Sequence, residues 1–320
     1  MKKYLLIPLL LTAAIPLTFK SRHYTIQWEK GKNFPLNLSE IKAITCNNKI
    51  YVIGGRINKS TTDFSMNVNV DYNFEYNPGN EEWTKKDSMP FKDYDVALAT
   101  INDKIFAIGS KTAMYDPGTD KWQLKKPLAD GKAHLEAEVV KGRIYVFGFY
   151  ECPNPGKTMM YDPKEDTWTK VAPVPEARIG PVVATVKDKI YVMGGIGLKE
   201  DGSVDFRQRL HRVDIYNPKT NTWESGQSLP ESFWSAEGVV VFDNKIFLIN
   251  VRSGIGHLKD NIYMYNPLSG EWSNIKANLP VNYSELGITL LDNKIYVIGG
   301  HDKLFVQHDD VLTGIIEKSR

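Results

Sequence analysis

A short stretch decides the fold of this chain, and its first copy reads Lys49-Ile50-Tyr51-Val52-Ile53-Gly54-Gly55. The pattern is a basic residue, an isoleucine, an aromatic residue and further apolar residues. Five more copies begin at Lys104, Arg143, Lys189, Lys245 and Lys294. Consecutive apolar residues rich in β-branched and aromatic side chains are typical of a strand buried on both faces. The copies therefore predict six equivalent interior strands.

A second motif follows each of the first five copies: Tyr, then Asn or Asp, then Pro, with Trp seven residues after the tyrosine. Its copies are Tyr76–Trp83, Tyr115–Trp122, Tyr161–Trp168, Tyr216–Trp223 and Tyr265–Trp272. An Asx-Pro pair favours a tight turn, so the tyrosine and the tryptophan are expected on adjacent antiparallel strands. An apolar run also precedes each copy of the first motif, joined to it by a turn such as Asp243-Asn244.

The spacing of the two motifs shows which part of the repeat is constant. The distance from each Trp to the next motif isoleucine is nearly the same in every unit, as from Trp83 to Ile105. The distance from that isoleucine to its tyrosine varies widely, from the short Ile105–Tyr115 segment to the long Ile50–Tyr76 segment. Each unit thus supplies four strands, called a to d in chain order, and its variable length lies between b and c. Repeated four-stranded antiparallel units predict an all-β propeller, in this chain with six blades.

The last blade lacks its own outer strand. Only the segment 301–320 follows Gly300, and it contains neither Tyr-Asx-Pro nor Trp. Trp28, however, precedes Ile50 by the same spacing that separates Trp83 from Ile105. We therefore expect Thr25 to Trp28 to form strand d of the last blade, so that both ends of the chain close the ring and remove its exposed edges.

These motifs resemble the kelch repeat, in which a Gly-Gly pair follows an Ile-Tyr strand and a Tyr-Asp-Pro and a Trp come later. The resemblance covers residues 23–316 and implies a six-bladed kelch β-propeller. Three copies depart from the Gly-Gly pair, with Gly109-Ser110, Gly148-Phe149 and Ile249-Asn250 in its place.

The N-terminus has the order of a secretory signal peptide. Met1-Lys2-Lys3 is positively charged, and Tyr4 to Phe19 is an apolar run interrupted by two prolines. We interpret residues 1–20 as a signal peptide and expect an exported protein, whether periplasmic, secreted or on the cell surface. The run is shorter than the roughly 20 apolar residues that a membrane span needs, so the mature chain is not expected to span a membrane.

Composition and motifs exclude several classes of function. The net charge is +2, from 40 basic and 38 acidic residues, which gives no reason to expect nucleic-acid binding. Two cysteines, Cys46 and Cys152, cannot form a disulfide framework, and Cys46 is expected to be a small buried residue. The six histidines lack metal-site spacing, and no phosphate-binding or dinucleotide motif occurs. Neither a metal nor a cofactor is expected.

Successive strands of a blade alternate in direction, so the b–c and d–a connections share one face of the propeller. Length varies only in the b–c connections, which are longest from Arg56 to about Asp71 and from Ile196 to about Arg212. Because variable loops on a rigid scaffold usually carry binding residues, we expect the ligand site on this face. The candidate binding residues around the mouth of the central channel are Arg56, Tyr94, His134, Arg178, Trp234, Arg252, Tyr283 and His301.

Two functions fit this arrangement, and binding is favoured over catalysis. The first is a binding module for a protein or glycan. The alternative is a cofactor-free sugar epimerase or mutarotase, because the chain is similar in size and repeat number to exported kelch propellers that act on sialic acid. In that case Glu237 or Glu285 is a candidate acid or base, and Arg178 or Arg252 could hold a carboxylate.

Overall fold

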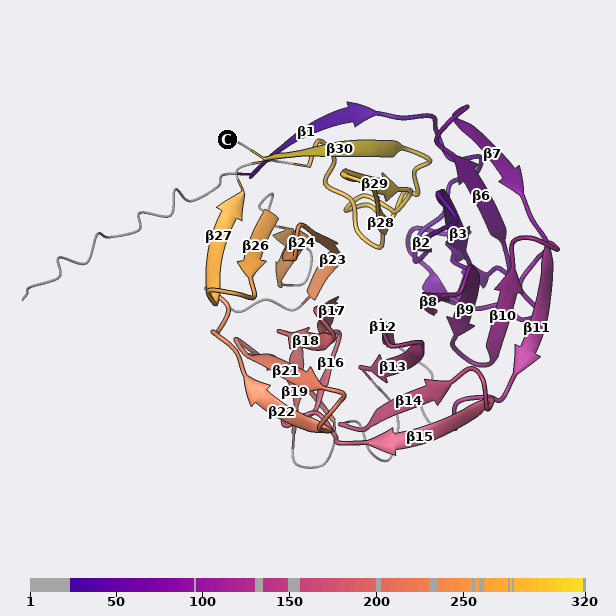
Figure 1. Cartoon of the computed structure of the whole chain (residues 1–320). Helices are drawn as coiled ribbons and strands as arrows, with labels where there is room; N and C mark the ends of the chain where they lie inside the picture. The colour runs from indigo at the N-terminus through magenta and orange to yellow at the C-terminus, as the bar shows by residue number, and fades with distance from the viewer. Residues whose placement is uncertain are drawn as a thin grey trace, which may run out of the picture.

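The computed structural model in Figure 1 is all-β and propeller-like, with sheets arranged in a ring. It describes residues 24–94, 96–129, 135–148, 156–199, 203–230, 235–254, 257–258, 262–275, 277 and 279–318. In this part of the chain, six antiparallel sheets carry the repeat. The expectation of an all-β propeller is confirmed.

Each of the six sheets runs from an innermost strand near the axis to an outermost strand at the rim. From innermost to outermost strand, the first sheet contains β2 (Lys42–Cys46), β3 (Lys49–Ile53), β6 (Asn73–Asn77) and β7 (Glu82–Lys85), and the second contains β8 (Ala97–Ile101), β9 (Lys104–Ile108), β10 (Thr112–Asp116) and β11 (Lys121–Lys125). The third contains β12 (Glu136–Val140), β13 (Arg143–Phe147), β14 (Thr158–Asp162) and β15 (Thr167–Val171), and the fourth contains β17 (Val182–Val186), β18 (Lys189–Met193), β21 (Val213–Asn217) and β22 (Thr222–Ser225). The fifth contains β23 (Ser235–Phe242), β24 (Lys245–Gly254), β26 (Ile262–Asn266) and β27 (Glu271–Ile275), and the sixth contains β28 (Gly287–Leu291), β29 (Lys294–Ile298), β30 (Val311–Lys318) and β1 (Tyr24–Lys30).

The innermost strands contact one another around the axis. The contacts run from β2 to β8, β12, β17, β23 and β28, and then back to β2. The outermost strand of the sixth sheet is β1, which pairs antiparallel with β30 over its whole length, from Tyr24 opposite Lys318 to Lys30 opposite Leu312. The first and last described segments of the chain therefore lie side by side (Figure 1).

Each repeat motif occupies one row across its sheet. In the first sheet, Ile50 on β3 faces Tyr76 on β6, and Tyr76 faces Trp83 on β7. The rings of Tyr76 and Trp83 are 4.8 Å apart, and the four later Tyr–Trp pairs have centroid distances between 4.7 and 5.0 Å. In the sixth sheet the same row reads Ile295, Gly314 and Trp28, so a glycine replaces the tyrosine.

The turns have the backbone that their residues favour. Asn47 and Asn48 both have positive φ, at 51° and 57°, and so do Asn102 and Asp103 in the next sheet. Two consecutive positive φ angles are the signature of the tight hairpin that suits the twist of a sheet. At the c–d turns, the Asx side chain accepts a hydrogen bond from the backbone two residues later, as Asp116 does from Gly118 at 2.9 Å. The turn chemistry expected from the sequence is confirmed.

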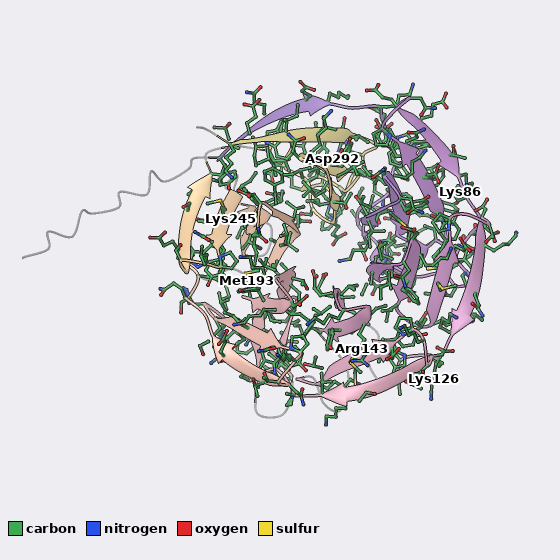
Figure 2. The ribbon with its side chains drawn as sticks, in the orientation of Figure 1. Lys86, Lys126, Arg143, Met193, Lys245 and Asp292 are labelled. Carbon is green, nitrogen blue, oxygen red and sulfur yellow. The ribbon has the colours of Figure 1, made fainter. Side chains whose placement is uncertain are left out.

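The hydrophobic core lies between neighbouring sheets, and side chains fill the space between the ribbons (Figure 2). Met193 is fully buried, whereas Lys86 and Lys126 lie at the outer rim in Figure 2. The repeat tryptophans also hydrogen-bond to the connection that precedes their own sheet. For example, Trp122 Nε1 donates to the Asp87 carbonyl at 2.8 Å. Cys46 is 2% exposed, which confirms that it is a small buried residue.

The two longest b–c connections contain secondary structure of their own. The first folds into β4 (Arg56–Ile57), the 3₁₀ helix η1 (Phe64–Met66) and β5 (Val68–Asn69). The other forms β19 (Ile196–Leu198) and β20 (Val204–Arg209), which add to β16 (Arg178–Ile179) in a small separate sheet. A further short strand, β25 (His257–Leu258), pairs with β24.

Some expectations concern residues outside the described ranges. The signal peptide at residues 1–20 is one of them, and Cys152 is another. Among the residues that are described, no helix has the length and apolar character needed to cross a bilayer.

Candidate functional site

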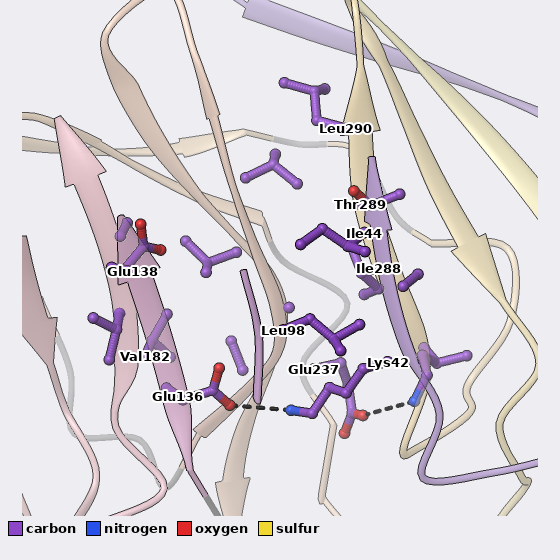
Figure 3. Close-up of a pocket in the computed structure, with 18 of the residues that line it drawn as sticks. Lys42, Ile44, Leu98, Glu136, Glu138, Val182, Glu237, Ile288, Thr289 and Leu290 are labelled. Carbon is purple, nitrogen blue, oxygen red and sulfur yellow. Dashed lines mark hydrogen bonds and ion pairs between the residues drawn. The ribbon is translucent and has the colours of Figure 1, made fainter. Parts of the chain in front are cut away.

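A cavity of about 560 Å³ lies on the axis of the ring. All six innermost strands contribute to its wall, and the connections that precede β2 and β28 contribute Glu40 and Glu285. Most of the lining residues are apolar, with Ile44, Val182 and Ile288 among the side chains that Figure 3 shows around the cavity, but polar and apolar atoms share its surface about equally. The six strands thus form a channel with a mixed lining, in which polar side chains lie among apolar ones.

The charged groups of this wall are mostly acidic. Among the described lining residues they are Glu40, Glu136, Glu138, Glu237, Glu285 and Lys42. Lys42 Nζ contacts Glu136 Oε1 at 3.1 Å and so joins the sheets that contain β2 and β12 (Figure 3). The balance of the described lining favours cationic or hydroxyl-rich groups over free anions.

Glu138 has a strongly perturbed carboxyl. It lies on β12 two residues from Glu136, so both side chains lie on the same face of the strand. Burial raises the pKa of Glu138 from its ordinary value of 4.5 to about 8; Thr185 opposes this shift, and the charge of Glu136 adds to it. Near neutral pH this carboxyl is therefore mainly protonated and can donate a hydrogen bond into the channel.

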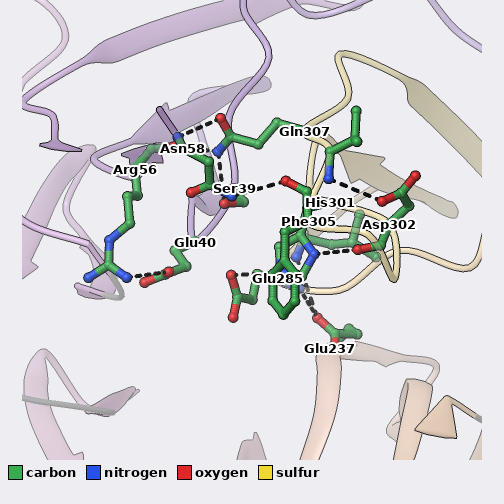
Figure 4. Close-up of polar contacts among 12 residues, drawn as sticks. Ser39, Glu40, Arg56, Asn58, Glu237, Glu285, His301, Asp302, Phe305 and Gln307 are labelled. Carbon is green, nitrogen blue, oxygen red and sulfur yellow. Dashed lines mark hydrogen bonds and ion pairs between the residues drawn. The ribbon is translucent and has the colours of Figure 1, made fainter. Parts of the chain in front are cut away.

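His301 and Glu285 form a hydrogen-bonded pair at one end of the channel. His301 Nε2 lies 3.1 Å from Glu285 Oε2, and His301 Nδ1 lies 2.7 Å from the carbonyl oxygen of Asp302. Because a carbonyl can only accept, Nδ1 carries a proton and Nε2 faces the carboxylate. Glu237 accepts hydrogen bonds from the backbone N–H groups of Glu285, at 2.5 Å, and Leu286, at 3.4 Å (Figure 4).

Arg56 lies beside the His301–Glu285 pair, at the same end of the channel. Its Nη1 donates to Glu40 Oε1 at 2.7 Å, its Nε donates to Asn69 Oδ1 at 3.2 Å, and its guanidinium lies 3.7 Å from the centre of the Tyr94 ring. The Glu40 N–H also donates to the Glu285 carbonyl at 3.0 Å, which connects this cluster to the His301 pair. Glu40 and Glu285 both have positive φ, at 52° and 60°. Such strain in non-glycine residues is concentrated at functional sites.

We call Glu40, Arg56, Glu237, Glu285 and His301 the channel mouth. They come from the connections and strands of three different sheets and are shown together in Figure 4. The structure therefore brings together Arg56, Tyr94, His301, Glu237 and Glu285, which were candidates from the sequence.

Arg178 does not present its guanidinium to the channel. It lies on β16 with only 2% of its surface exposed, and its Nη2 forms a buried ion pair with Asp214. Its Nε donates to the Glu176 carbonyl at 2.9 Å, and Arg212 Nη2 contacts the other oxygen of Asp214 at 2.5 Å. Breaking such a buried pair is costly, so we leave Arg178 out of the proposed site.

Tyr283 is also largely occupied by packing. Its hydroxyl donates to Asp310 Oδ2 at 3.0 Å, and its ring stacks on His308 with centroids 4.1 Å apart. Burial, with the Asp310 hydrogen bond and nearby carboxylates, raises the pKa of Tyr283 to about 12. This tyrosine fixes the connection before β28 rather than offering a free hydroxyl.

Three further candidates cannot be placed at the mouth. His134 and Trp234 lie outside the described residues. Arg252 belongs to β24, but its side chain is outside the described part of the structure. These three remain predictions.

The sequence candidates did not include three polar groups of the channel, namely Glu40, Lys42 and Glu138. Glu40 had a readable signal, because it precedes Ile50 by the same offset that separates Glu285 from Ile295. Across the described residues there is no group of three or more His, Cys, Asp or Glu side chains placed to hold a metal ion.

Comparisons with known sequences agree with the repeat pattern. A family model described as the KLHDC2/KLHL20/DRC7 Kelch-repeats domain matches residues 110–300, and the Kelch motif matches residues 39–90. Kelch repeat and BTB domain-containing protein 12 of Homo sapiens is 23% identical over 205 residues, which are 59% of this chain and 25% of that protein. Kelch-like protein 25 of Homo sapiens is 27% identical over 133 residues, 36% of this chain and 21% of the relative. The chain therefore matches about a quarter or less of the length of these relatives.

A comparison with solved structures supports the same fold. The structure of YjhT superposes with a TM-score of 0.69 at 14% sequence identity, over 91% of this chain and 99% of that one. At this identity the likeness shows the fold alone. The family match over residues 110–300 covers more than half of the sequence. The chain therefore belongs to the kelch-repeat family.

Proposed function

We propose that this chain is a six-bladed propeller closed by β1, and that it binds a protein or glycan ligand over the channel mouth. The six sheets, the contacts that return from β28 to β2, and the pairing of β1 with β30 support the blade count and the closure. The b–c and d–a connections that form the mouth share one face of such a ring.

One observation carries the proposed binding site. Acidic, basic and imidazole side chains from separate sheets converge at the end of a cavity of about 560 Å³, whose lining combines apolar strand residues with polar side chains. A concave site with a few fixed polar groups is the usual form of a ligand site. On the opposite face, the Asx side chains of the c–d turns accept hydrogen bonds within their own turns, and two of them, Asp116 and Asp162, also pair with the strand residues Lys104 and Arg143.

The test compares the two faces of the propeller. Ligands are first selected with the full chain from a glycan array and from a displayed library of random peptides. Arg56→Ala and His301→Ala should then weaken binding of the selected ligand by roughly 30-fold, as expected for loss of an interface anchor of about 2 kcal/mol. The controls are Lys164→Ala and Lys219→Ala, two exposed residues of c–d turns. Loss of binding in the controls alone would assign the function to the opposite face.

The second candidate is a cofactor-free sugar mutarotase or epimerase, and the His301–Glu285 pair favours it. In a mutarotation, Glu285 could take the proton of the anomeric hydroxyl while the imidazolium of His301 donates a proton to the ring oxygen. The bond from the anomeric carbon to the ring oxygen would break, and the reverse transfers would close the ring on the other face. This step uses one positioned general base and one positioned general acid.

This alternative has its own readout. NMR should follow anomer interconversion of free sialic acid and of a neutral aldose with catalytic amounts of the protein. Acceleration that is lost in Glu285→Gln and His301→Gln would support catalysis. The acidic surplus of the described lining disfavours the carboxylate of sialic acid, so the neutral sugar is expected to be the better substrate of the two.

Export remains part of the proposal and rests on the sequence pattern of residues 1–20. Mass spectrometry of the protein from its native host should find a mature N-terminus between about residues 14 and 23, as for a typical signal peptide. Recovery of soluble cytoplasmic protein with an intact Met1 would contradict export.

A further inference from the structure

Large apolar side chains are exposed mainly on the face that carries the channel mouth. Within the described ranges, those that are exposed are Met66, Leu124, Phe206, Leu268, Leu304, Phe305 and Val306. Five of the seven lie in b–c connections. Three of these are consecutive in the sequence: Leu304 is 63% exposed, Phe305 37% and Val306 45%. We call residues 302–307, between β29 and β30, the apolar turn. Contiguous exposed apolar groups usually mark an interaction surface.

The apolar turn is held in a fixed conformation by its own backbone. Asp302 N–H donates to the Val306 carbonyl at 3.0 Å, and Phe305 N–H donates to the Asp302 carbonyl at 3.0 Å. The Asp302 carboxylate also accepts from the N–H groups of Leu304 and Val306. Burial opposes its ionisation, but these hydrogen bonds and His308 hold the pKa of Asp302 below its usual range. Phe305 is kept at a φ of 61°, a strained angle for an aromatic residue.

The apolar turn is also fixed to the neighbouring sheet. Gln307 Nε2 donates to Ser39 Oγ at 2.9 Å and to the Arg56 carbonyl at 2.6 Å, and Gln307 Oε1 accepts from the Asn58 N–H at 2.8 Å (Figure 4). These bonds bridge the first and sixth sheets beside the channel mouth. A surface that is ordered before binding loses little entropy when a partner docks, so the turn presents its three apolar side chains as a preformed ridge.

The ridge is continuous with the acidic part of the channel mouth. The Phe305 ring lies 4.9 Å from the His301 ring, which in turn contacts Glu285. Glu237 and Asp302 add carboxylates on either side of this pair (Figure 4). A docking partner that covers the ridge therefore meets an apolar surface first and negative charge immediately beside it.

We propose that the apolar turn is a docking ridge for a protein segment that places an apolar side chain next to a lysine or arginine. This inference rests on the proposed binding function and specifies its partner. The apolar side chain would cover Leu304 and Val306, while the cation would reach the carboxylates of Glu285 and Glu237. A glycan fits less well, because Leu304 and Val306 offer no hydrogen bonds from their side chains and Phe305, the aromatic ring, is the least exposed of the three.

The experiment uses the full chain and a displayed library of random peptides as the probe. We expect enrichment of sequences in which a large apolar residue stands beside Lys or Arg. The double variant Leu304→Ser, Val306→Ser should bind the enriched peptide about tenfold more weakly or worse, because anchors at a docking ridge carry most of its affinity. Its melting temperature should stay close to that of the wild type, since both side chains are exposed.

Matched controls come from apolar residues exposed elsewhere. Leu124→Ser lies on the outer strand β11 and Leu268→Ser on a c–d turn, with 54% and 86% exposure. Both should keep wild-type affinity. Glu285→Gln, or exchange of the peptide's basic residue for Glu, should weaken binding as well.

The outcomes separate the two proposals. Suppose that binding depends on Arg56 and His301 but not on Leu304 and Val306. This result would contradict the proposal that the apolar turn is a docking ridge and would leave the channel mouth as the binding site. Binding lost only in Leu268→Ser would overturn both. Enrichment of glycans alone, or of peptides without the apolar–basic pair, would also overturn the ridge.

Discussion

The sheet β8–β11 and the sheet β28–β29–β30–β1 have the same four-stranded plan but differ in two ways. In the first, the row across the strands reads Ile105, Tyr115 and Trp122, and in the second Gly314 replaces the tyrosine. In the first, β9 and β10 are joined by residues 109–111, whereas residues 299–310 join β29 to β30 and carry His301 and the apolar turn. The sheet that departs from the repeat is thus also the one that supplies much of the channel mouth.

Loss of β1 from the sixth sheet should lower the stability of the folded chain more than any single substitution. Deleting residues 24–30 removes the strand that covers β30 together with the buried side chains of Tyr24 and Ile26. We expect the melting temperature to fall by roughly 10 °C or more, because several kcal/mol of packing and pairing are lost. Calorimetry should compare this variant with a deletion of residues 1–20, the segment interpreted from the sequence as a signal peptide. Equal melting temperatures for the two deletions would contradict the role of β1.

Gly314→Ala should test the substituted row directly. A Cβ at this position would lie 2.6 Å from Cζ3 of Trp28 and 2.9 Å from Cγ2 of Ile26. Overpacking of this kind costs about 1–3 kcal/mol, measured as the free energy of unfolding in urea. Gly79→Ala, in a c–d turn where the nearest atom is 3.3 Å away, serves as the control and should change little. If Gly314→Ala had the same free energy of unfolding as the wild type, Trp28 would be able to move aside without a cost in stability.

The sheets also differ inside the channel, at the position of Glu138. It faces Tyr145 on the adjacent strand, and the matching residue of the sixth sheet is Thr289, which faces Tyr296. Because its pKa in the folded chain is raised to about 8, the stability linked to its protonation is complete below pH 4.5 and lost as the pH rises through about 8. Glu138→Gln should therefore match the wild type near pH 4 and exceed it by roughly 1–2 kcal/mol near pH 8.5, after allowance for partial exposure. Parallel pH profiles of unfolding would refute this.

The smallest effect concerns the indole N–H groups. Trp122 Nε1 donates to the Asp87 carbonyl, whereas Trp28 Nε1 is buried with no hydrogen-bond partner within the described structure. Trp122→Phe should cost about 1 kcal/mol more than Trp28→Phe, because only the former removes a formed hydrogen bond. Chemical denaturation of both variants measures the difference. A larger cost for Trp28→Phe would contradict this assignment.

The regular part of the fold could be predicted from sequence because it repeats. Ile, Tyr and Trp keep their spacing since they occupy one row of each sheet, and Asx residues mark the turns because they tolerate positive φ. The position of Arg178 in the repeat could not predict that its guanidinium is buried away from the channel. Its burial depends on an ion pair with Asp214, which lies in a different strand.

Other parts of the site depend on contacts between separate connections. Glu40 and Glu285 share an offset in the repeat, but their mutual backbone contact follows only from the adjacency of β2 and β28. Leu304-Phe305-Val306 could be seen in the sequence as an apolar run inside a polar connection. Nothing in its pattern shows that Asp302 and Gln307 hold it outward rather than folding it into the core.

The pairing of β1 with β30 also imposes an order in time on folding. During synthesis β1 emerges before every other described strand, and its partner emerges after all of them. Each of the other five sheets can assemble from consecutive chain, but the sixth must wait until translation has passed residue 311. Until then β1 is an unpaired strand with free N–H and C=O groups, the kind of edge that pairs with other chains. Misassembly between nascent copies is therefore expected to begin at this strand.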